Sequence, residues 1–275
     1  MRSLAAVAAL CCACSGSARG DEPADAPSDP EVDAPIVVDA AIVDDDGDGL
    51  DDAYELEVAH DYLPFISLDP DDGCERSGLV VRVRRHPADP TKLSIIYDQL
   101  FERDCGLNGH VGDNEVFGIV IDPTRPAPAG ILAIRTASHQ STLCERVTEC
   151  TTCPNDERDA CDLAPIAGVM WPVLYASKGK HGQYASAARC PLLGTCFDQC
   201  TLNSTRLRPP VVNVGEPTVA LVHDLTAQGF INATNGWTEP TLMAHDPWNS
   251  AIDFGDAGNV ADDLVDPEFV PGLCP

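Results

Sequence analysis

The sequence predicts a mainly β protein, an antiparallel β-sandwich with long disulfide-tied loops and a short N-terminal helix. Short segments alternate apolar and polar residues or run apolar and β-branched, as expected for strands. These segments are 78–86, 92–101, 115–122, 130–139 and 169–177. The intervals between them are rich in Pro, Gly, Asn and Asp, which end strands. No long helical periodicity occurs, so short strands joined by loops predict a sandwich or barrel.

The N-terminus "MRSLAAVAALCCACSGSARGDEP" has the pattern of an export signal over residues 1–19. One Arg precedes an apolar run that is too short to span a bilayer, and small residues follow it. Cys14, followed by Ser15 and Gly16, is the natural candidate for lipidation. Leu10 lies one position too early for a good lipobox, so a lipid-anchored envelope protein and a released extracellular protein both stay open.

The rest of the chain divides by composition into three parts. Residues 20–43 are rich in Asp, Pro and Ala and predict a disordered acidic linker. Residues 44–60 predict an acidic loop and a short helix, and residues 61–275 the disulfide-stabilised sandwich domain. The net charge of −27 excludes nucleic acid as a partner, and it excludes anionic membranes unless cations bridge them.

Ten of the 13 cysteines follow residue 60. An even number in an exported chain predicts up to five disulfides, whose pairing the sequence does not determine. The alternative is zinc, because Cys150 and Cys153 form a CxxC and Cys196 and Cys200 a CxxxC. Neither has the tandem spacing of a zinc ribbon or finger, so disulfides are favoured.

The segment "DDDGDGLDDAYE" has the grammar of a calcium-binding EF-hand loop, D-x-D-x-D-G-x5-E. Alternating carboxylates on a tight turn can bring three hard oxygens to one point, and Gly49 permits the bend. The loop ligands that this predicts are Asp44, Asp46, Asp48, the backbone carbonyl of Leu50, and Glu55, with Asp52 acting through water. The loop has Asp51 at its eighth position and no preceding helix. It therefore resembles the single calcium loops of bacterial surface proteins and thrombospondin type 3 repeats more than a paired EF-hand.

A second polar cluster stands in "GLNGHVGDNEVFGIVID", at the mouth of a predicted strand. Asp113 and Glu115 point to the same face of an extended segment, because side chains alternate with period two. Glycines let His110 join them. Asp104 lies just upstream, and His139 and His181 stand at the ends of other predicted strands. Carboxylates with imidazoles suit a divalent cation, Ca²⁺ or Mg²⁺ before Zn²⁺.

Four segments, "HDYLPFISLDPDDGC", "GHVGDNEVFGIVID", "ASHQ" and "YASKGKHGQYAS", occur in an order that resembles the vacuolar protein sorting-associated protein 62 family. More distantly they resemble the necrosis-inducing protein family with its "GHRHDWE" heptad. The resemblance covers residues 60–187. It implies a β-sandwich with a divalent-cation pocket at one end, which in the necrosis-inducing family helps engage sphingolipid headgroups.

The resemblance carries over residue by residue. His110, Asp113 and Glu115 match the first histidine, the aspartate and the glutamate of the heptad, and Asp104 is similar to an upstream loop aspartate. His139 and His181 match later histidines of the sorting family. The heptad's arginine, second histidine and tryptophan are replaced here by Val111, Gly112 and Asn114. These departures argue against toxin activity, whereas the fold and the cation pocket stay expected.

The function that the sequence favours is a cation-dependent surface module that binds a polar lipid headgroup or a glycan. One alternative is a metal-dependent hydrolase, in which a cation-bound water beside Glu115 and His181 attacks a phosphoester or an amide. The chain has no G-x-S-x-G elbow and no H-E-x-x-H motif, so catalysis is the less favoured alternative. The other alternative is a structural surface lipoprotein.

Overall fold

A computed structural model describes residues 42–213 of the chain, apart from residues 45–46, 75, 107–108, 110, 140–142, 155, 191–196, 202–204 and 210. The chain divides into two units, residues 1–40 and 41–275, and every described residue belongs to the second. The predicted export signal, Cys14 and the linker therefore lie outside the described residues, apart from the last two residues of the linker. No helix in the described part of the chain is long and apolar enough to cross a bilayer.

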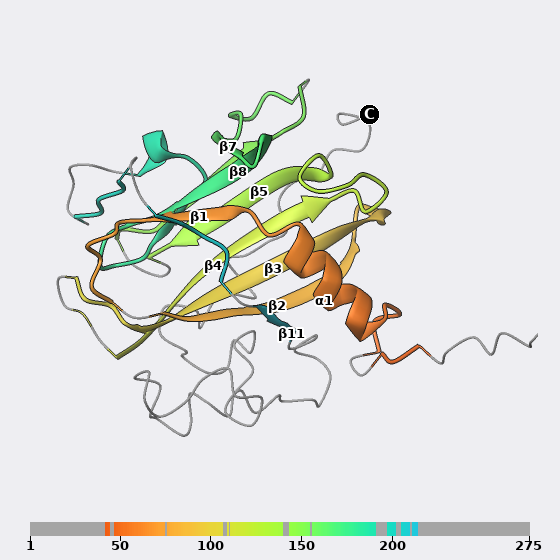
Figure 1. Cartoon of the computed structure of the whole chain (residues 1–275), viewed down its shortest axis with the longest axis horizontal. Helices are drawn as coiled ribbons and strands as arrows, with labels where there is room; N and C mark the ends of the chain where they lie inside the picture. The colour runs from red at the N-terminus through yellow and green to blue at the C-terminus, as the bar shows by residue number, and fades with distance from the viewer. Residues whose placement is uncertain are drawn as a thin grey trace, which may run out of the picture. The chain divides into compact units, whose positions relative to one another are not determined.

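The prediction of a mainly β fold with a short N-terminal helix is confirmed (Figure 1). The helix α1 spans Asp52–Asp61. The strands are β1 (Phe65–Leu68), β2 (Arg76–His86), β3 (Asp89–Arg103), β4 (Val111–Ile121), β5 (Ile131–Ser138), β6 (Arg146–Thr151), β7 (Leu163–Ile166), β8 (Val169–Ala176), β9 (Gln183–Tyr184), β10 (Thr205–Leu207) and β11 (Val211–Asn213). A 3-10 turn covers Ala187–Arg189.

The strands form two sheets. The larger has the order β11-β2-β3-β4-β5-β6, and the smaller has the order β10-β1-β8-β7, with β9 also paired to β8. Consecutive strands β2 to β6 form an antiparallel meander. The predicted segments 78–86, 92–101, 115–122 and 130–139 correspond to β2 to β5, whereas β6 was not predicted. Two pairings are parallel instead, β1 with β8 and β2 with β11. They join segments far apart in the sequence, which local patterning does not reveal.

One hydrophobic core joins the two sheets and the helix. Ile66 and Leu174 enter it from the smaller sheet, Ile95 and Ile119 from the larger one, and Val58 from α1. The central strands of the larger sheet are buried on both faces: Ile96 and Val120, whose side chains point away from this core, are also buried. This burial on both sides explains why the segment 116–121 is almost continuously apolar.

The helix is held by a cap and by a hydrogen bond to the sheet. The Asp51 carboxylate accepts hydrogen bonds from the backbone N–H groups of Ala53 and Tyr54, which makes Asp51 the N-cap. The buried Tyr97 hydroxyl of β3 donates to the carbonyl of Ala59, 2.7 Å away. The acidic residue that departs from the EF-hand pattern thus starts α1.

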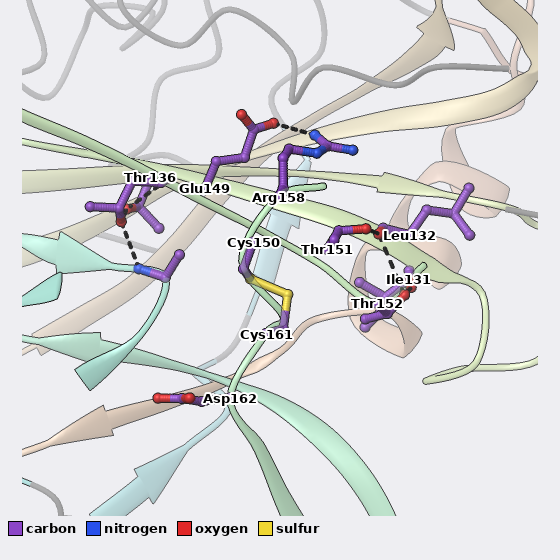
Figure 2. Close-up of a disulfide and its surroundings, with 12 residues drawn as sticks. Ile131, Leu132, Thr136, Glu149, Cys150, Thr151, Thr152, Arg158, Cys161 and Asp162 are labelled. Atoms are coloured by element: carbon purple, nitrogen blue, oxygen red, sulfur yellow. Dashed lines mark hydrogen bonds and ion pairs between the residues drawn. A yellow bond between two sulfur atoms is a disulfide. The ribbon is translucent and has the colours of Figure 1, made fainter. Parts of the chain in front are cut away.

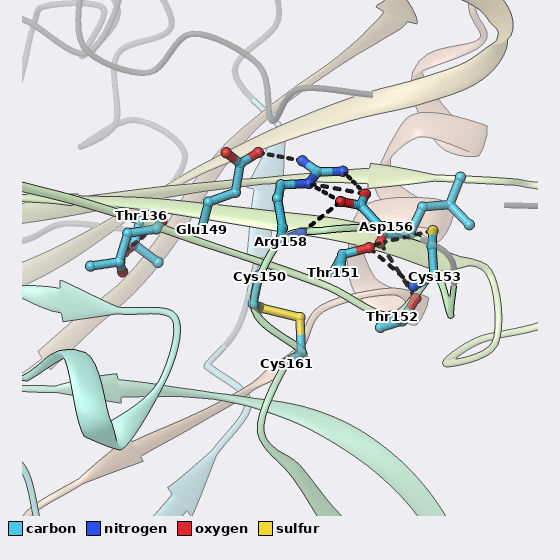
Figure 3. Close-up of polar contacts among 11 residues, drawn as sticks. Thr136, Glu149, Cys150, Thr151, Thr152, Cys153, Asp156, Arg158 and Cys161 are labelled. Carbon is cyan, nitrogen blue, oxygen red and sulfur yellow. Dashed lines mark hydrogen bonds and ion pairs between the residues drawn. A yellow bond between two sulfur atoms is a disulfide. The ribbon is translucent and has the colours of Figure 1, made fainter. Parts of the chain in front are cut away.

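Disulfides join Cys74 to Cys105, Cys150 to Cys161 and Cys190 to Cys200. Cys144 and Cys153 are disulfide-bonded as well. Figure 2 shows Cys150–Cys161 joining the end of β6 to the segment that leads into β7. Beside it, Arg158 forms ion pairs with Glu149 and with Asp156 (Figure 3). The prediction of disulfides in place of zinc is therefore supported for the CxxC cysteines.

Candidate functional site

At one end of the larger sheet, the face that lines the core changes from apolar to polar. Directly opposed residues of β3 and β4 share a face. The successive pairs on this face are Tyr97–Phe117, Gln99–Glu115 and Phe101–Asp113. All six side chains are buried, so Asp113 and Glu115 are shielded from solvent although they lie near the N-terminal end of β4. Buried carboxylates require partners or a cation.

His181 lies between two carboxylates at this end. Its Nδ1 is 2.6 Å from Asp113 Oδ2, and its Nε2 is 3.1 Å from Asp72 Oδ2. The imidazole stacks on the Phe101 ring, with centroids 3.7 Å apart and planes 5° apart. His181 has a left-handed backbone (φ 59°), which is uncommon outside glycine and aims the ring at the sheet. Three distant segments of chain thus meet at one imidazole.

The charges within this cluster are strongly coupled. Burial lowers the pKa of His181, but hydrogen bonds and charges from Asp113 and Asp72 outweigh burial and raise it to about 9. Burial raises the pKa of Asp72, but the contacts with His181 and the Gly179 N–H lower it overall. His181 is therefore an imidazolium at neutral pH. It supplies the positive charge between the two carboxylates that a metal cation would otherwise supply.

The Asp72, Asp113 and His181 side chains fit a divalent cation by their chemistry. Carboxylate oxygens suit Ca²⁺ and Mg²⁺, and an imidazole extends the range to Zn²⁺. The Cys74 sulfur also lies within 4.8 Å of ligand atoms of Asp72 and His181. It is bonded to Cys105, however, so it offers no thiolate. A cation at this cluster would compete with the proton on His181.

A disulfide and two backbone hydrogen bonds hold Asp72 and the His181 turn in place. Asp72 Oδ1 accepts a hydrogen bond from the Gly179 N–H at 2.6 Å, and the Cys105 N–H donates to the Gly179 carbonyl at 2.6 Å. Cys74, two residues after Asp72, is bonded to Cys105, so the disulfide joins the two segments that make these contacts. The residues before β2, the end of β3 and the turn after β8 are thereby joined.

The structure brings some of the predicted ligands of the second site together and places Asp104 elsewhere. Asp113 and His181 are in contact, and Glu115 stands two residues along the same face of β4. Asp104 contacts other groups: its carboxylate lies 3.6 Å from Lys180 Nζ and accepts a hydrogen bond from the Gly106 N–H. His110 lies outside the described residues.

His139 belongs to a second buried cluster. Its Nε2 lies 2.6 Å from Asp198 Oδ2, and the Tyr184 hydroxyl donates to the same oxygen at 2.6 Å. Burial raises the pKa of Tyr184, and the nearby charges of Asp198 and Glu115 raise it further. The end of the sandwich therefore carries two histidine–carboxylate clusters rather than one.

The predicted calcium loop forms a tight turn before α1. The Asp44 carboxylate accepts hydrogen bonds from the backbone N–H groups of Gly47, Asp48 and Gly49, at 2.7, 3.1 and 3.0 Å. Both glycines have positive φ, and the Leu50 side chain packs into the core. Burial raises the pKa of Asp48, and the charges of Asp44 and Asp52 oppose its ionisation further. A cation would relieve this repulsion. Glu55 is buried, and Asp46 lies outside the described residues.

Sequence reasoning missed two residues of these clusters, Asp72 and Asp198. Asp72 stands in "DPDDGC", next to a predicted disulfide cysteine, and Asp198 stands in "CFDQC" between two cysteines. An acidic residue in a disulfide-tied loop is a weak signal, because such loops are usually solvated. Only the tertiary contacts with histidines distinguish these two from other acidic residues.

Comparison with known proteins shows a loose structural likeness. No family model and no curated protein matches the chain. A solved structure described as "Toxin fold for microbial attack and plant defense" has 14% identity and a TM-score of 0.34, covering 84% of this chain and 98% of its own. Two structures of NLPPya, with glucosamine and with mannosamine, have 14% identity and TM-scores of 0.40 and 0.39; each covers 83% of this chain and 96% of its own. At these values the likeness assigns neither a family nor an activity.

Proposed function

We propose that this protein is an exported, cation-dependent binding module of the cell surface or the extracellular medium. Its divalent cation is held by Asp113 and Glu115 of β4 and by His181 Nδ1, while Asp72 orients the imidazole through Nε2. The observation that carries the proposal is the meeting of two buried carboxylates, Asp113 and Asp72, at the ring nitrogens of His181. Metal binding requires that His181 lose its proton, so the cation takes the place of that proton next to Asp113.

The ligand that we propose is a polar lipid headgroup or a glycan bridged by this cation. A hard cation with protein ligands on one side can accept hydroxyl or phosphate oxygens on the other. The surface of the chain is strongly acidic, with a net charge of −27. Direct attraction to anionic headgroups is therefore excluded, and any such binding requires the cation.

Calcium at the 44–55 loop has a separate, structural role in this proposal. Asp44, Asp48 and Glu55, with the carbonyl of Leu50, hold the ion, and Asp46 completes the pattern in the sequence. The buried Leu50 side chain connects the loop to the core. Calcium should therefore stabilise the sandwich without taking part in ligand binding.

The test is binding of the full secreted chain to sphingolipid-containing vesicles and to a glycan array, in Ca²⁺, in Mg²⁺ and in EDTA. We expect binding that EDTA abolishes, that Asp113→Asn abolishes, and that the exposed control Glu57→Gln retains. Binding that persists in EDTA would refute the cation bridge. Absence of binding to every lipid and glycan, despite measurable cation uptake, would refute the ligand class and leave the cation site.

A further inference from the structure

The hairpin of β7 and β8 carries a long uncharged stretch with exposed apolar side chains. Residues 163–177 contain no charged side chain, although 22% of the whole chain is Asp, Glu, Lys or Arg. Three large apolar side chains of this hairpin are about half exposed: Leu163 (49%), Val169 (47%) and Met170 (50%). Single exposed apolar residues are ordinary, but three on one short hairpin form a patch of the kind that marks an interaction site.

The backbone of the hairpin is largely satisfied within the hairpin itself. Among the described strands, β7 pairs only with β8, at the end of the smaller sheet (Figure 1). Ala167 and Gly168 form a two-residue turn in which both have positive φ, 50° and 84°. On the unpaired edge of β7, Pro165 has no N–H group that would require a partner. The hairpin therefore presents side chains to its surroundings rather than free backbone donors.

Aromatic and cationic side chains lie together at the base of the hairpin. The Arg208 guanidinium is 4.7 Å from the centre of the Trp171 ring, and the Phe65 ring meets Trp171 edge-on with centroids 5.6 Å apart. All three side chains are partly exposed. Tryptophan and arginine side chains prefer the boundary between lipid headgroups and hydrocarbon, because each combines an apolar body with a polar group.

We propose that this hairpin inserts into the interfacial layer of an uncharged lipid bilayer. A second copy of the chain carries the same net charge of −27, so self-association meets a repulsion that a zwitterionic bilayer does not exert. Addition of a foreign strand to the edge of β7 is disfavoured by Pro165. Each strand of the hairpin has a four-residue paired part that extends for about 13 Å, which reaches the interfacial layer but cannot cross a hydrocarbon core of about 30 Å.

The hairpin and the cation cluster lie at opposite ends of β8. Val169 begins this eight-residue strand beside the turn, and Ala176 ends it five residues before His181. An extended strand of this length separates its two ends by about 25 Å. Insertion of the hairpin therefore turns the cation cluster away from the bilayer that the hairpin enters. The inference does not rest on the proposed function, because it uses no residue of that cluster.

The test is cosedimentation of the full, unlipidated chain with phosphatidylcholine vesicles in EDTA, which removes any cation-bridged binding. We expect the wild type to bind, and Val169→Asp and Met170→Asp each to weaken binding at least about tenfold, because a charge replaces an inserted apolar side chain. The control Leu56→Asp places the same charge at an equally exposed position of α1 (41%) and should bind like the wild type. Phosphatidylserine should weaken wild-type binding, because the chain is strongly acidic.

Wild-type chain that stays in solution at every lipid concentration would overturn the inference, as would full binding of Met170→Asp. Dimerisation in analytical ultracentrifugation that Met170→Asp abolishes, without vesicle binding, would assign the hairpin to a second copy and also overturn it. If the Asp variants do not fold, Leu163→Gln and Met170→Gln should each weaken binding about five- to tenfold. Because the hairpin binds vesicles in EDTA, the cation bridge is judged on the glycan array and on Met170→Asp, so the two proposals fail separately.

Discussion

Replacing Asp113 by Asn removes one of the two charges that keep His181 protonated, with almost no change in side-chain volume. His181 is wholly buried, and its pKa is raised to about 9 from an ordinary 6.5. At about 1.4 kcal/mol per pKa unit, the two carboxylates together contribute on the order of 3 kcal/mol to folding through this proton. The variant therefore tests the central cluster through stability alone, without a ligand.

The direction of the pH dependence follows from the raised pKa. The contribution is fully present below the unfolded value, about pH 6.5, and is lost as pH rises through the folded value, about 9. In excess EDTA, the free energy of unfolding of the wild type should fall by about 2 kcal/mol between pH 7 and pH 9. In Asp113→Asn only Asp72 faces the ring, so this fall should be roughly half as large.

The assay is urea unfolding followed by tryptophan fluorescence at pH 6, 7, 8 and 9. At pH 7, Asp113→Asn should be less stable than the wild type by about 1–3 kcal/mol, because a buried charge loses a partner. The control Asp159→Asn removes an exposed carboxylate that pairs with Arg189, and it should keep the full pH dependence. Identical pH dependence in wild type and Asp113→Asn would refute the account of His181.

Four further outcomes are expected. Asp44→Asn should abolish the rise in melting temperature that Ca²⁺ gives the wild type, whereas Glu57→Gln should keep it; an unchanged rise would exclude the 44–55 loop as the calcium site. Asp104→Asn should leave Mn²⁺ affinity nearly unchanged in equilibrium dialysis, because Asp104 contacts Lys180 rather than His181. Tyr97→Phe should lower the free energy of urea unfolding by about 1–2 kcal/mol, because the Ala59 carbonyl loses a buried donor. The Cys150→Ser, Cys161→Ser double variant should lose about 3 kcal/mol in the same assay, as expected for closing a loop of this length.

The strands of the larger sheet are largely readable from the sequence. Their patterns are local: segments such as 78–86 and 115–122 alternate, and the turns between them carry Pro, Gly and Asp. Neighbouring segments then pair in chain order, which requires only short turns. In the smaller sheet, β8 is readable in this way, as the predicted segment 169–177, but β1 and β10 are not. Phe65–Leu68 and Thr205–Leu207 are short, and each becomes a strand only because a distant partner is present.

The sequence by itself determined which chemical groups this protein carries: an acidic loop with EF-hand spacing, carboxylates on one face of a strand, and histidines at strand ends. It also indicated disulfide chemistry, through the even number of cysteines after residue 60. Only the tertiary structure decided which of these groups meet. His181 lies against Asp113 and Asp72, while His139 lies against Asp198. The physical reason is that such contacts depend on sheet packing and on loops joined by disulfides across large sequence separations, whereas patterning and spacing describe only neighbours along the chain.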